Sequence, residues 1–272
     1  MHRFPVALVL CTSFFSALLY SADLTAQELR IYTTVRHGEA DGQLKEIAHS
    51  LTLFHNGKVY DFMEDVGEVV IYEPMNNRFV FMDGNYRASE LQVEELQQYL
   101  KVSQAETRKY LKQLDQDGSP LALKQASAIR FEMTPTFTEK YDNTRQRLLL
   151  SSEIVRYEVT TTNAKDPQAV EKYLAYSDWF ARLNHILHPQ SSQPEPRLAL
   201  NAALRKRGQL PLKVERLMRI ESEVRLQAEH QYTWDLQSTD QRHITKWESQ
   251  LESKDVVWVS FRDYQKKLLT SR

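Results

Sequence analysis

The chain has 272 residues, 42% of them hydrophobic and 26% charged, and its formal net charge at pH 7 is -1. This charge balance argues against a nucleic-acid partner, because phosphate backbones call for a basic surface. The single cysteine is Cys11. Because it lies in the N-terminal run that we expect to be cleaved, the mature protein would have no disulfide framework, no thiol nucleophile and no thiolate ligands for zinc or iron–sulfur clusters.

The N-terminus has the layout of a secretory signal peptide. A basic start ending at Arg3 precedes the uncharged run 4–19, which is shorter than the roughly 20 residues that cross a bilayer. Small residues follow, so we expect residues 1–26 to be a signal peptide that is cleaved near Ala22 or Ala26. The mature protein would then be exported to the periplasm or the medium. An uncleaved anchor or a buried first helix is the alternative.

Two hairpins are predicted in the first half of the chain. Asn56-Gly57 separates segments 51–55 and 58–62, and this pair favours a type I′ turn because both central residues need positive φ. Segments 67–72 and 78–82 flank a loop rich in turn-forming residues, and Asp83-Gly84 then turns the chain into another strand. The pattern predicts an antiparallel meander.

A long amphipathic helix follows. Its apolar residues recur at spacings of three and four from Val93 to Leu114, and the loop 115–120 ends it. Strands are expected to resume at 128–133, 136–141 and 146–162, the last of them long and rich in β-branched residues.

Two further helices are expected between residues 166 and 208, as an insertion in the sheet. Asp166 at the N-cap and Pro167 at the first helical position are a start signal, because Asp accepts free backbone N–H groups and Pro has none to satisfy. A linker at 191–196 leads to the second helix, which runs from about Arg197 to Gly208.

The C-terminal part contains the clearest strand. Apolar residues alternate with polar ones from Val224 to Leu236, as expected for a half-buried antiparallel strand beside segment 212–220. We expect Trp234 on its apolar face to be buried against helix residues. Asp240 is then expected to cap a helix, which a short strand at 256–261 and a final helical turn follow.

Histidines and carboxylates are the candidates for metal or catalytic sites. His185 and His188 are close enough on one helix to share a metal, but no carboxylate accompanies them. Segment 115–118 resembles part of a calcium loop whose first and last positions lack carboxylates. Three more histidines lie in or beside strands and are interpreted as hydrogen-bonded core residues: His49, His55 and His230. We assign no metal, no cofactor and no catalytic residue.

Enzyme motifs are scarce in this sequence. The seven glycines lack the spacing of a dinucleotide fingerprint or a Walker loop, which disfavours nucleotide binding. The GxSxG, SxxK and HExxH motifs are absent as well. A glycosidase needs only two carboxylates at the right separation, so a hydrolase acting outside the cytoplasm stays open as an alternative.

Aromatic side chains of the predicted strands are the candidates for lining an apolar ligand cavity. The alternative is that they form a dry core. They are Tyr60, Phe62, Tyr72, Phe79, Phe81, Tyr232 and Trp234.

Two resemblances cover most of the chain. The runs SLTLFHNGKVYDF, GEVVIYEP, RFVFMDG and YLAYSDWFARLNHILHP resemble a family of exported bacterial proteins without assigned function. The order of strand, turn, strand, DG, strand and helix is also similar to the lipoprotein-carrier and sigma-regulator sheets (LolA/RseB-like), in which a curved antiparallel sheet wraps helices over an apolar hollow. This resemblance implies a lipid-binding role and assigns no residue to it.

We expect an α+β fold in one domain over 27–272: a large curved antiparallel sheet packed against a few helices, in the form of a LolA-like half-barrel. The expected function is that of a non-enzymatic extracytoplasmic protein that binds an apolar ligand, a lipid, a lipoprotein or an envelope protein. The hydrolase and a purely structural envelope module are the alternatives. A carrier predicts a hollow lined by aromatic and aliphatic side chains, whereas a hydrolase predicts converging carboxylates or histidines in a cleft.

Overall fold

The computed structural model describes residues 28–39, 42–188, 191–219 and 223–270, so the expected signal peptide lies outside it. The strands join in one 12-stranded sheet with the order β12-β6-β5-β4-β3-β2-β1-β11-β10-β9-β8-β7. Neighbouring strands are antiparallel except for the parallel pair β12 and β6. The predicted α+β class with a large antiparallel sheet is confirmed.

The strands are Leu29–Glu39 (β1), Lys45–His55 (β2), Lys58–Met63 (β3), Glu68–Glu73 (β4), Arg78–Met82 (β5), Arg87–Gln92 (β6), Thr138–Asp142 (β7), Arg147–Ser151 (β8), Val155–Asn163 (β9), Gln209–Arg219 (β10), Glu223–Thr233 (β11) and Val257–Trp258 (β12). The helices are Val93–Asp117 (α1), Pro120–Met133 (α2), Pro167–Leu187 (α3), Glu195–Arg205 (α4), Ser238–Glu252 (α5) and Phe261–Thr270 (α6).

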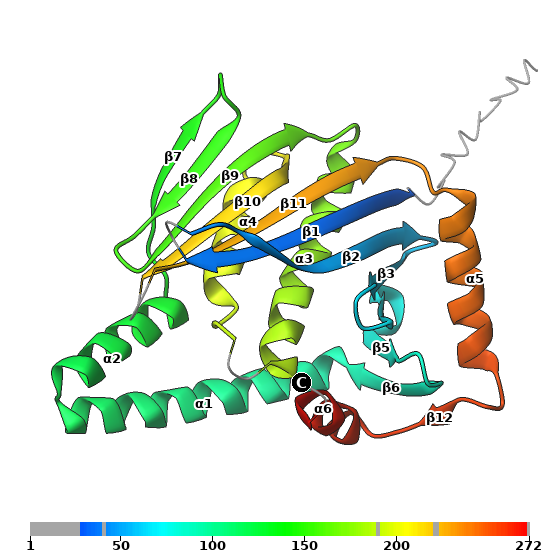
Figure 1. The fold of residues 1–272 in the computed structure, drawn as a ribbon, viewed down its shortest axis with the longest axis horizontal. Helices are drawn as coiled ribbons and strands as arrows, with labels where there is room; N and C mark the ends of the chain where they lie inside the picture. The colour runs from blue at the N-terminus through cyan, green and yellow to red at the C-terminus, as the bar shows by residue number, and fades with distance from the viewer. Residues whose placement is uncertain (1–27, 40–41, 189–190, 220–222, 271–272) are drawn as a thin grey trace, which may run out of the picture.

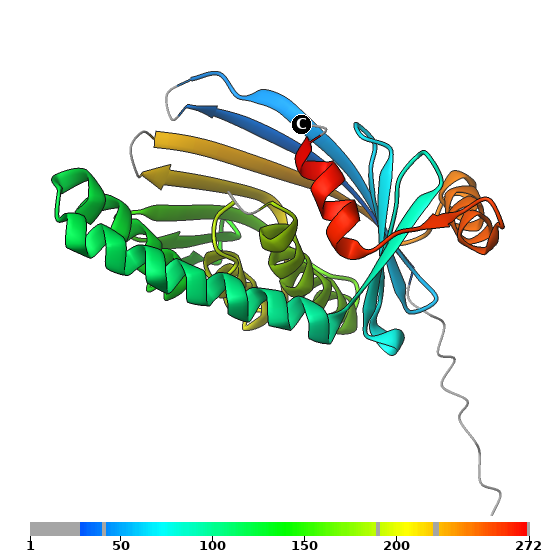
Figure 2. The ribbon, with the colours of Figure 1, turned by 90° about the horizontal axis from the view of Figure 1, so that it is seen from below.

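The sheet is strongly curved, and helices cover both of its faces (Figures 1 and 2). Helices α3, α4 and α6 lie on the concave side, and α1 runs along the open side of the curve (Figure 2). Helix α5 lies on the other side, against the strands β2 to β5 (Figure 2). The three helices expected on the concave face were those that correspond to α1, α3 and α4. A helix was also expected in the position of α5, but its place on the convex face was not predicted.

The core consists of two main clusters separated by the sheet. The larger one joins the concave face to α3, α4 and α6, and it includes Phe79, Leu174 and Leu200. The smaller one lies between β2–β5 and α5, where Trp247 stacks on Tyr60 with ring centroids 6.0 Å apart. Strands covered on both faces carry apolar residues on both sides, which is why β4 and β5 read as continuous apolar runs.

Local signals in the sequence are borne out where they depend on a few neighbouring residues. Asn56 and Gly57 have φ of 49° and 75°, as the predicted hairpin turn requires. Asp166 accepts a hydrogen bond from the Gln168 N–H and caps α3. Gly118, with φ of 63°, ends α1.

Two predicted strands were wrong. Residues 128–133 belong to α2, which starts like α3: Ser119 accepts the Ala122 N–H and Pro120 occupies the first turn. The long strand 146–162 is two strands, β8 and β9, joined by a tight turn in which the Ser152 hydroxyl accepts the N–H groups of the next residues. The period of the apolar residues does not detect such a turn.

The C-terminal elements differ from the prediction in detail. Asp240 lies in the first turn of α5 and forms a capping box with Gln237, which is itself the N-cap. The strand β12 has two residues, and Phe261 begins α6 instead of ending a strand. Strand β11 ends at Thr233, so Trp234 lies just beyond it and is partly buried instead of fully buried.

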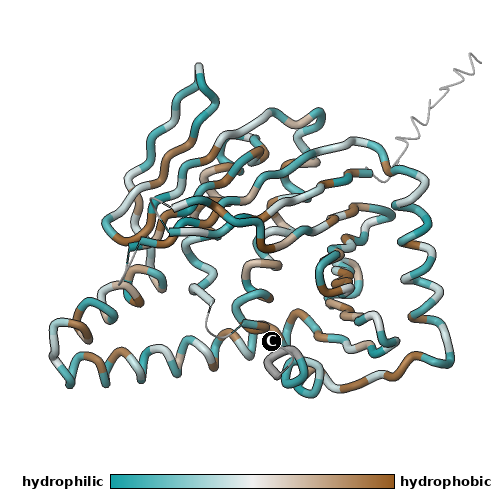
Figure 3. The backbone as a smooth tube through the Cα atoms, viewed as in Figure 1, coloured by the Kyte–Doolittle hydropathy of each residue, from teal (hydrophilic) through white to brown (hydrophobic). Residues whose placement is uncertain are grey.

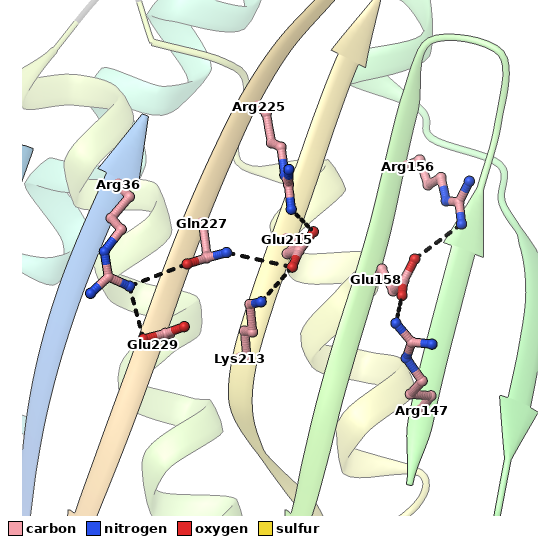
Figure 4. Close-up of polar contacts among 9 residues, drawn as sticks. All are labelled: Arg36, Arg147, Arg156, Glu158, Lys213, Glu215, Arg225, Gln227 and Glu229. Atoms are coloured by element: carbon pink, nitrogen blue, oxygen red, sulfur yellow. Dashed lines mark hydrogen bonds and ion pairs between the residues drawn. The ribbon is translucent and has the colours of Figure 1, made fainter. Parts of the chain in front are cut away.

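The convex face of β1, β11, β10, β9 and β8 carries a ladder of ion pairs on the side away from the helices (Figure 4). Glu215 pairs with Lys213 and Arg225, at 2.7 Å each. Glu158 pairs in the same way with Arg147 and Arg156. Hydrophobic and hydrophilic residues alternate along these strands (Figure 3), as expected for a sheet with one solvated face. The carboxylates of this ladder are matched by cations, so it is a solvated surface and not a reactive cleft.

None of the helices in the described residues is both long and apolar enough to span a membrane.

Candidate functional site

A cavity of about 350 Å³ lies between the concave face of the sheet and α3. Its floor consists of residues of β1, β2, β3 and β11, and its roof of α3 together with Arg197 of α4. Sites for small molecules commonly have volumes of roughly 300–1,000 Å³ and mostly apolar walls. The apolar part of this wall is Ile31, Val35, Tyr173, Tyr176, Phe180 and Ala181.

Asp61 is a buried carboxyl group in this wall. It lies directly opposite Thr52 in the β2–β3 register, and the Thr52 hydroxyl donates to its Oδ1 at 2.7 Å. Its exposed fraction is 3%. Burial raises the pKa of Asp61 to about 6, against the opposing effect of hydrogen bonds from Thr52 and Tyr176. The carboxyl group therefore changes charge near pH 6.

His230 is the second titratable group of the floor. It lies opposite Thr33 in the β1–β11 register, with its Nδ1 2.9 Å from the Thr33 hydroxyl. Burial lowers the pKa of His230 to about 3, and the nearby Arg197 charge adds to this effect. The imidazole is therefore neutral. Its Nε2 is covered and has no hydrogen-bond partner in the part of the chain that the structure describes.

Asp61 and His230 occupy different rows of the sheet. Asp61 is in register with Thr52 and Ile31, whereas His230 is in register with Thr33, one row further along the sheet. Three inter-strand spacings of about 4.8 Å and two residues of about 3.4 Å give a backbone separation of ~16 Å along the sheet. The floor of the cavity thus has two separate titratable groups, each beside a threonine hydroxyl.

Arg197 reaches into the cavity from α4. Its Nη2 donates to the Ser177 hydroxyl at 3.1 Å and its Nε to the Asn201 Oδ1 at 3.0 Å. Asn201 in turn donates to Ser177 and to Asp178, at 3.1 and 2.7 Å. This network holds α4 against α3 and fixes the guanidinium at the edge of the cavity.

A search for known relatives of this chain bears on the interpretation of the cavity. No family model and no curated protein matches the sequence. The function therefore has to follow from the chemistry of the cavity.

The aromatic residues predicted to line a hollow lie in three different places. Tyr60 and Phe62 are on the convex side under α5, where both rings contact Trp247. Tyr72 and Phe79 stack at 4.8 Å in the core, and Phe81 packs against rings of α6.

The last two aromatics are Tyr232, which contacts residues of the cavity wall, and Trp234. The Tyr232 hydroxyl donates to the Pro211 carbonyl at 2.7 Å, and its ring packs against Tyr173. Trp234 packs at the border of the core, with the Lys165 amine 5.8 Å from its ring centroid. None of the seven side chains is among those that line the cavity. A ligand-binding role for them stays a prediction.

Three other histidines highlighted by the sequence each have a polar partner. His185 Nε2 lies 2.9 Å from the Ser103 hydroxyl, His49 pairs with Glu46 and His55 with Glu28. The His185 Nδ1 is buried without a partner among the described residues, but His185 does not line the cavity. Within the described ranges, no group of three or more His, Cys, Asp or Glu residues is arranged to hold a metal ion.

Sequence reasoning missed most of this site. His230 was interpreted as a hydrogen-bonded core residue, and its Nδ1 does have a partner, but the ring also lines the cavity. Asp61 and Arg197 were not considered. The available signal for Asp61 was a charged residue inside the otherwise apolar strand 58–63.

Proposed function

We propose that this chain is a non-enzymatic extracytoplasmic protein that holds an apolar or amphiphilic small molecule in the cavity under α3. The observation that carries the proposal is the covered Nε2 of His230, without a partner among the described residues, in an otherwise largely apolar cavity. Leaving a buried polar group unsatisfied costs about 1–3 kcal/mol. A ligand that satisfies it would recover this free energy.

The Asp61 carboxyl group supports the same proposal. Burial keeps the Asp61 carboxyl group protonated at pH values well above its ordinary pKa, so its ionisation destabilises the folded protein. Groups with pKa values perturbed in this way are common at functional sites. Its hydroxyl partner Thr52 and the ring of Tyr176 surround it with neutral groups. This end of the cavity suits a hydrogen-bond donor of the ligand.

The hydrolase alternative has less support from the cavity. Hydrolysis by a paired acid and base needs two titratable groups within hydrogen-bond reach of one reacting bond. The backbones of Asp61 and His230 are ~16 Å apart along the sheet, and each side chain has a hydroxyl partner of its own, Thr52 and Thr33. The cavity thus favours binding over catalysis.

The finer form of the proposal comes from the resemblance to lipoprotein-carrier sheets. A curved sheet with α3 and α4 packed over a hollow supports a LolA-like half-barrel. The partners that we propose are a lipid, a lipoprotein or another envelope protein. The signal-peptide pattern of residues 1–26 supports export to the periplasm or the medium.

The test is binding of an uncharged apolar dye, N-phenyl-1-naphthylamine, together with native mass spectrometry of the protein purified from its own envelope. Ala181→Phe fills the cavity from α3 and should abolish the dye's fluorescence gain. Lys172→Phe adds the same ring to the exposed side of the same helix and should leave dye binding unchanged. Equal binding by the wild type and Ala181→Phe would overturn the proposal, as would the absence of dye binding by the wild type.

A further inference from the structure

A second lobe of about 200 Å³ continues the cavity toward the segment 191–194. It shares Ala181, Asn184 and Arg197 with the first lobe, and Arg216 of β10 adds a second guanidinium. Both lobes have largely apolar walls, but their charged groups differ: Asp61 lines the first lobe, whereas Arg216 joins the shared Arg197 in the second.

Arg197 carries a charge that the fold does not neutralise. Its hydrogen bonds go to the neutral Ser177 and Asn201, and no carboxylate of the described residues forms an ion pair with it. The nearby Asp178 is paired with Arg205 instead. Arg197 also lies in the first turn of α4, where the helix dipole disfavours a cation. An unfavourable placement of this kind, here a cation at the N-terminal end of a helix, is typical of functional sites.

Arg216 is only partly satisfied. Its Nη2 donates to the Ser192 hydroxyl at 2.5 Å and lies 3.5 Å from the Glu132 carboxylate. Its Nε is buried without a partner among the described residues, as is the hydroxyl of Ser191, which lines the same lobe. The lobe therefore contains two hydrogen-bond donors without a partner among the described residues, beside the positive charge of Arg216.

The charges that face this lobe do not cancel. Among the described residues, its lining contains the two guanidinium groups and no carboxylate. Glu132, beside the lobe, pairs with Arg216 and accepts the Gln193 N–H at 3.2 Å. Both arginines and Glu132 are close enough to Tyr157, on the lobe's floor, to act on its hydroxyl. Glu132 offsets the charge of Arg216, and the charge of Arg197 is left to be matched.

We infer that the second lobe binds the anionic head group, a phosphate or carboxylate, of a ligand whose apolar chain occupies the first lobe. The inference rests on the proposed function and specifies its ligand class. Arg197, at the junction of the lobes, contacts the head group from one side and Arg216 from the other. Planar guanidinium groups suit such oxyanions because they offer paired donors.

Dodecyl phosphate, dodecanol and inorganic phosphate are the probes, compared by calorimetry and by displacement of the dye. The wild type should bind dodecyl phosphate about tenfold or more tightly than dodecanol, since a charged pair of this kind is worth at least one decade of affinity. Arg216→Gln should remove most of this preference and leave dodecanol binding unchanged. Arg197→Gln alters both lobes, so it should weaken the binding of dodecyl phosphate more than that of dodecanol. Arg216→Lys should retain part of the preference. Arg156→Gln, on the convex face of the neighbouring strand, is the matched control and should retain all of it.

The outcomes separate the two proposals. Equal affinity for dodecanol and dodecyl phosphate overturns the head-group inference and leaves the apolar cavity standing. Binding of dodecyl phosphate that the arginine variants do not weaken overturns it too. Saturable binding of inorganic phosphate that Arg216→Gln abolishes, without binding of dodecanol, would identify the source as a free anion and refute the apolar ligand. Failure of all three probes refutes both. If Arg197→Gln does not fold, as judged by its circular dichroism, Arg216→Gln decides.

Discussion

The substitution Asp61→Asn tests whether a carboxyl group is held in the cavity at the expense of stability. The amide has nearly the same shape, and its Oδ1 can accept the Thr52 hydroxyl as the carboxylate does. It carries no charge at any pH. The difference in unfolding free energy between the variant and the wild type therefore isolates the cost of ionising Asp61 inside the fold.

The magnitude follows from the pKa. A rise from 3.8 to about 6 corresponds to about 3 kcal/mol. Below the ordinary pKa, Asp61 is protonated in both the folded and the unfolded chain and costs nothing. As the pH rises toward the folded-state pKa, the unfolded chain ionises while the fold keeps its proton, so stability is lost. Above about pH 6 the loss reaches its full value and stays constant.

His230 has the opposite pH dependence, so the wild type alone gives an ambiguous profile. Its pKa is lowered from 6.5 to about 3, so its contribution to stability is present above the ordinary pKa and is lost as the pH falls. Between about pH 4 and pH 6 the two groups partly cancel. The comparison of Asp61→Asn with the wild type removes the His230 contribution, because both proteins contain the histidine.

The measurement is urea-induced unfolding of both proteins at several pH values, monitored by tryptophan fluorescence. The stability of Asp61→Asn relative to the wild type should increase by about 3 kcal/mol between about pH 4 and pH 7. Two profiles that run parallel over this range would refute the reasoning, because Asp61 would then titrate alike in the folded and unfolded chain.

Six other substitutions give simpler expectations. His230→Gln should gain stability relative to the wild type as the pH falls from 6.5 to about 4, by at most about 3 kcal/mol in the same urea assay. Gly57→Ala, at φ of 75°, should cost about 1 kcal/mol, whereas Gly84→Ala, where the added Cβ makes an ordinary contact, should be close to neutral. Phe79→Ala, at 0% exposure, should cost about 3–5 kcal/mol, against less than about 0.5 for Met75→Ala at 89% exposure. Trp234→Ala should shift the urea midpoint by less than a core tryptophan would, with a loss below about 3 kcal/mol, because the ring is only partly buried. A larger loss for Met75→Ala than for Phe79→Ala, or for Gly84→Ala than for Gly57→Ala, would contradict the burial and backbone arguments.

The elements that could be predicted from the sequence are those whose signals are local. Asn56-Gly57 determines a turn through the φ of two residues, and Asp166-Pro167 starts a helix through one side chain and one missing N–H. Neither needs a tertiary contact. The same start signal at Ser119-Pro120 was overlooked in favour of the β-like run that follows it, and α2 was therefore predicted in part as a strand.

The position of α5 depends on packing and could not be derived in this way. Its apolar face, with Ile244 and Trp247, could cover either side of the sheet. Only the contacts of Trp247 with Tyr60 and Phe62 show that it covers the convex side. The two rings thereby become core residues of that side, and they point away from the cavity.

Which side chains line the cavity depends on the pairing register of the strands. Its lining comes from four strands, α3 and α4, and a shift of one residue in any strand would turn the inward side chains outward. Thr33 and His230 are 197 residues apart in sequence, yet they lie opposite each other in neighbouring strands. The sequence of neither strand indicates which strand it pairs with.

Strand β3 shows how much of the site the sequence contained nonetheless. Side chains alternate between the faces of a strand, so Val59 and Asp61 share one face and Tyr60 and Phe62 the other. Both faces are covered, the first by α3 and the second by α5, so a carboxyl group at position 61 is buried in either register. A threonine or valine there would suit the β propensity and avoid the desolvation of a carboxylate. The chain instead has an acid, with a hydroxyl group opposite it and a cavity beside it. Since local rules are broken mainly where function requires it, this single residue is the strongest sequence-level argument that the concave face binds a ligand.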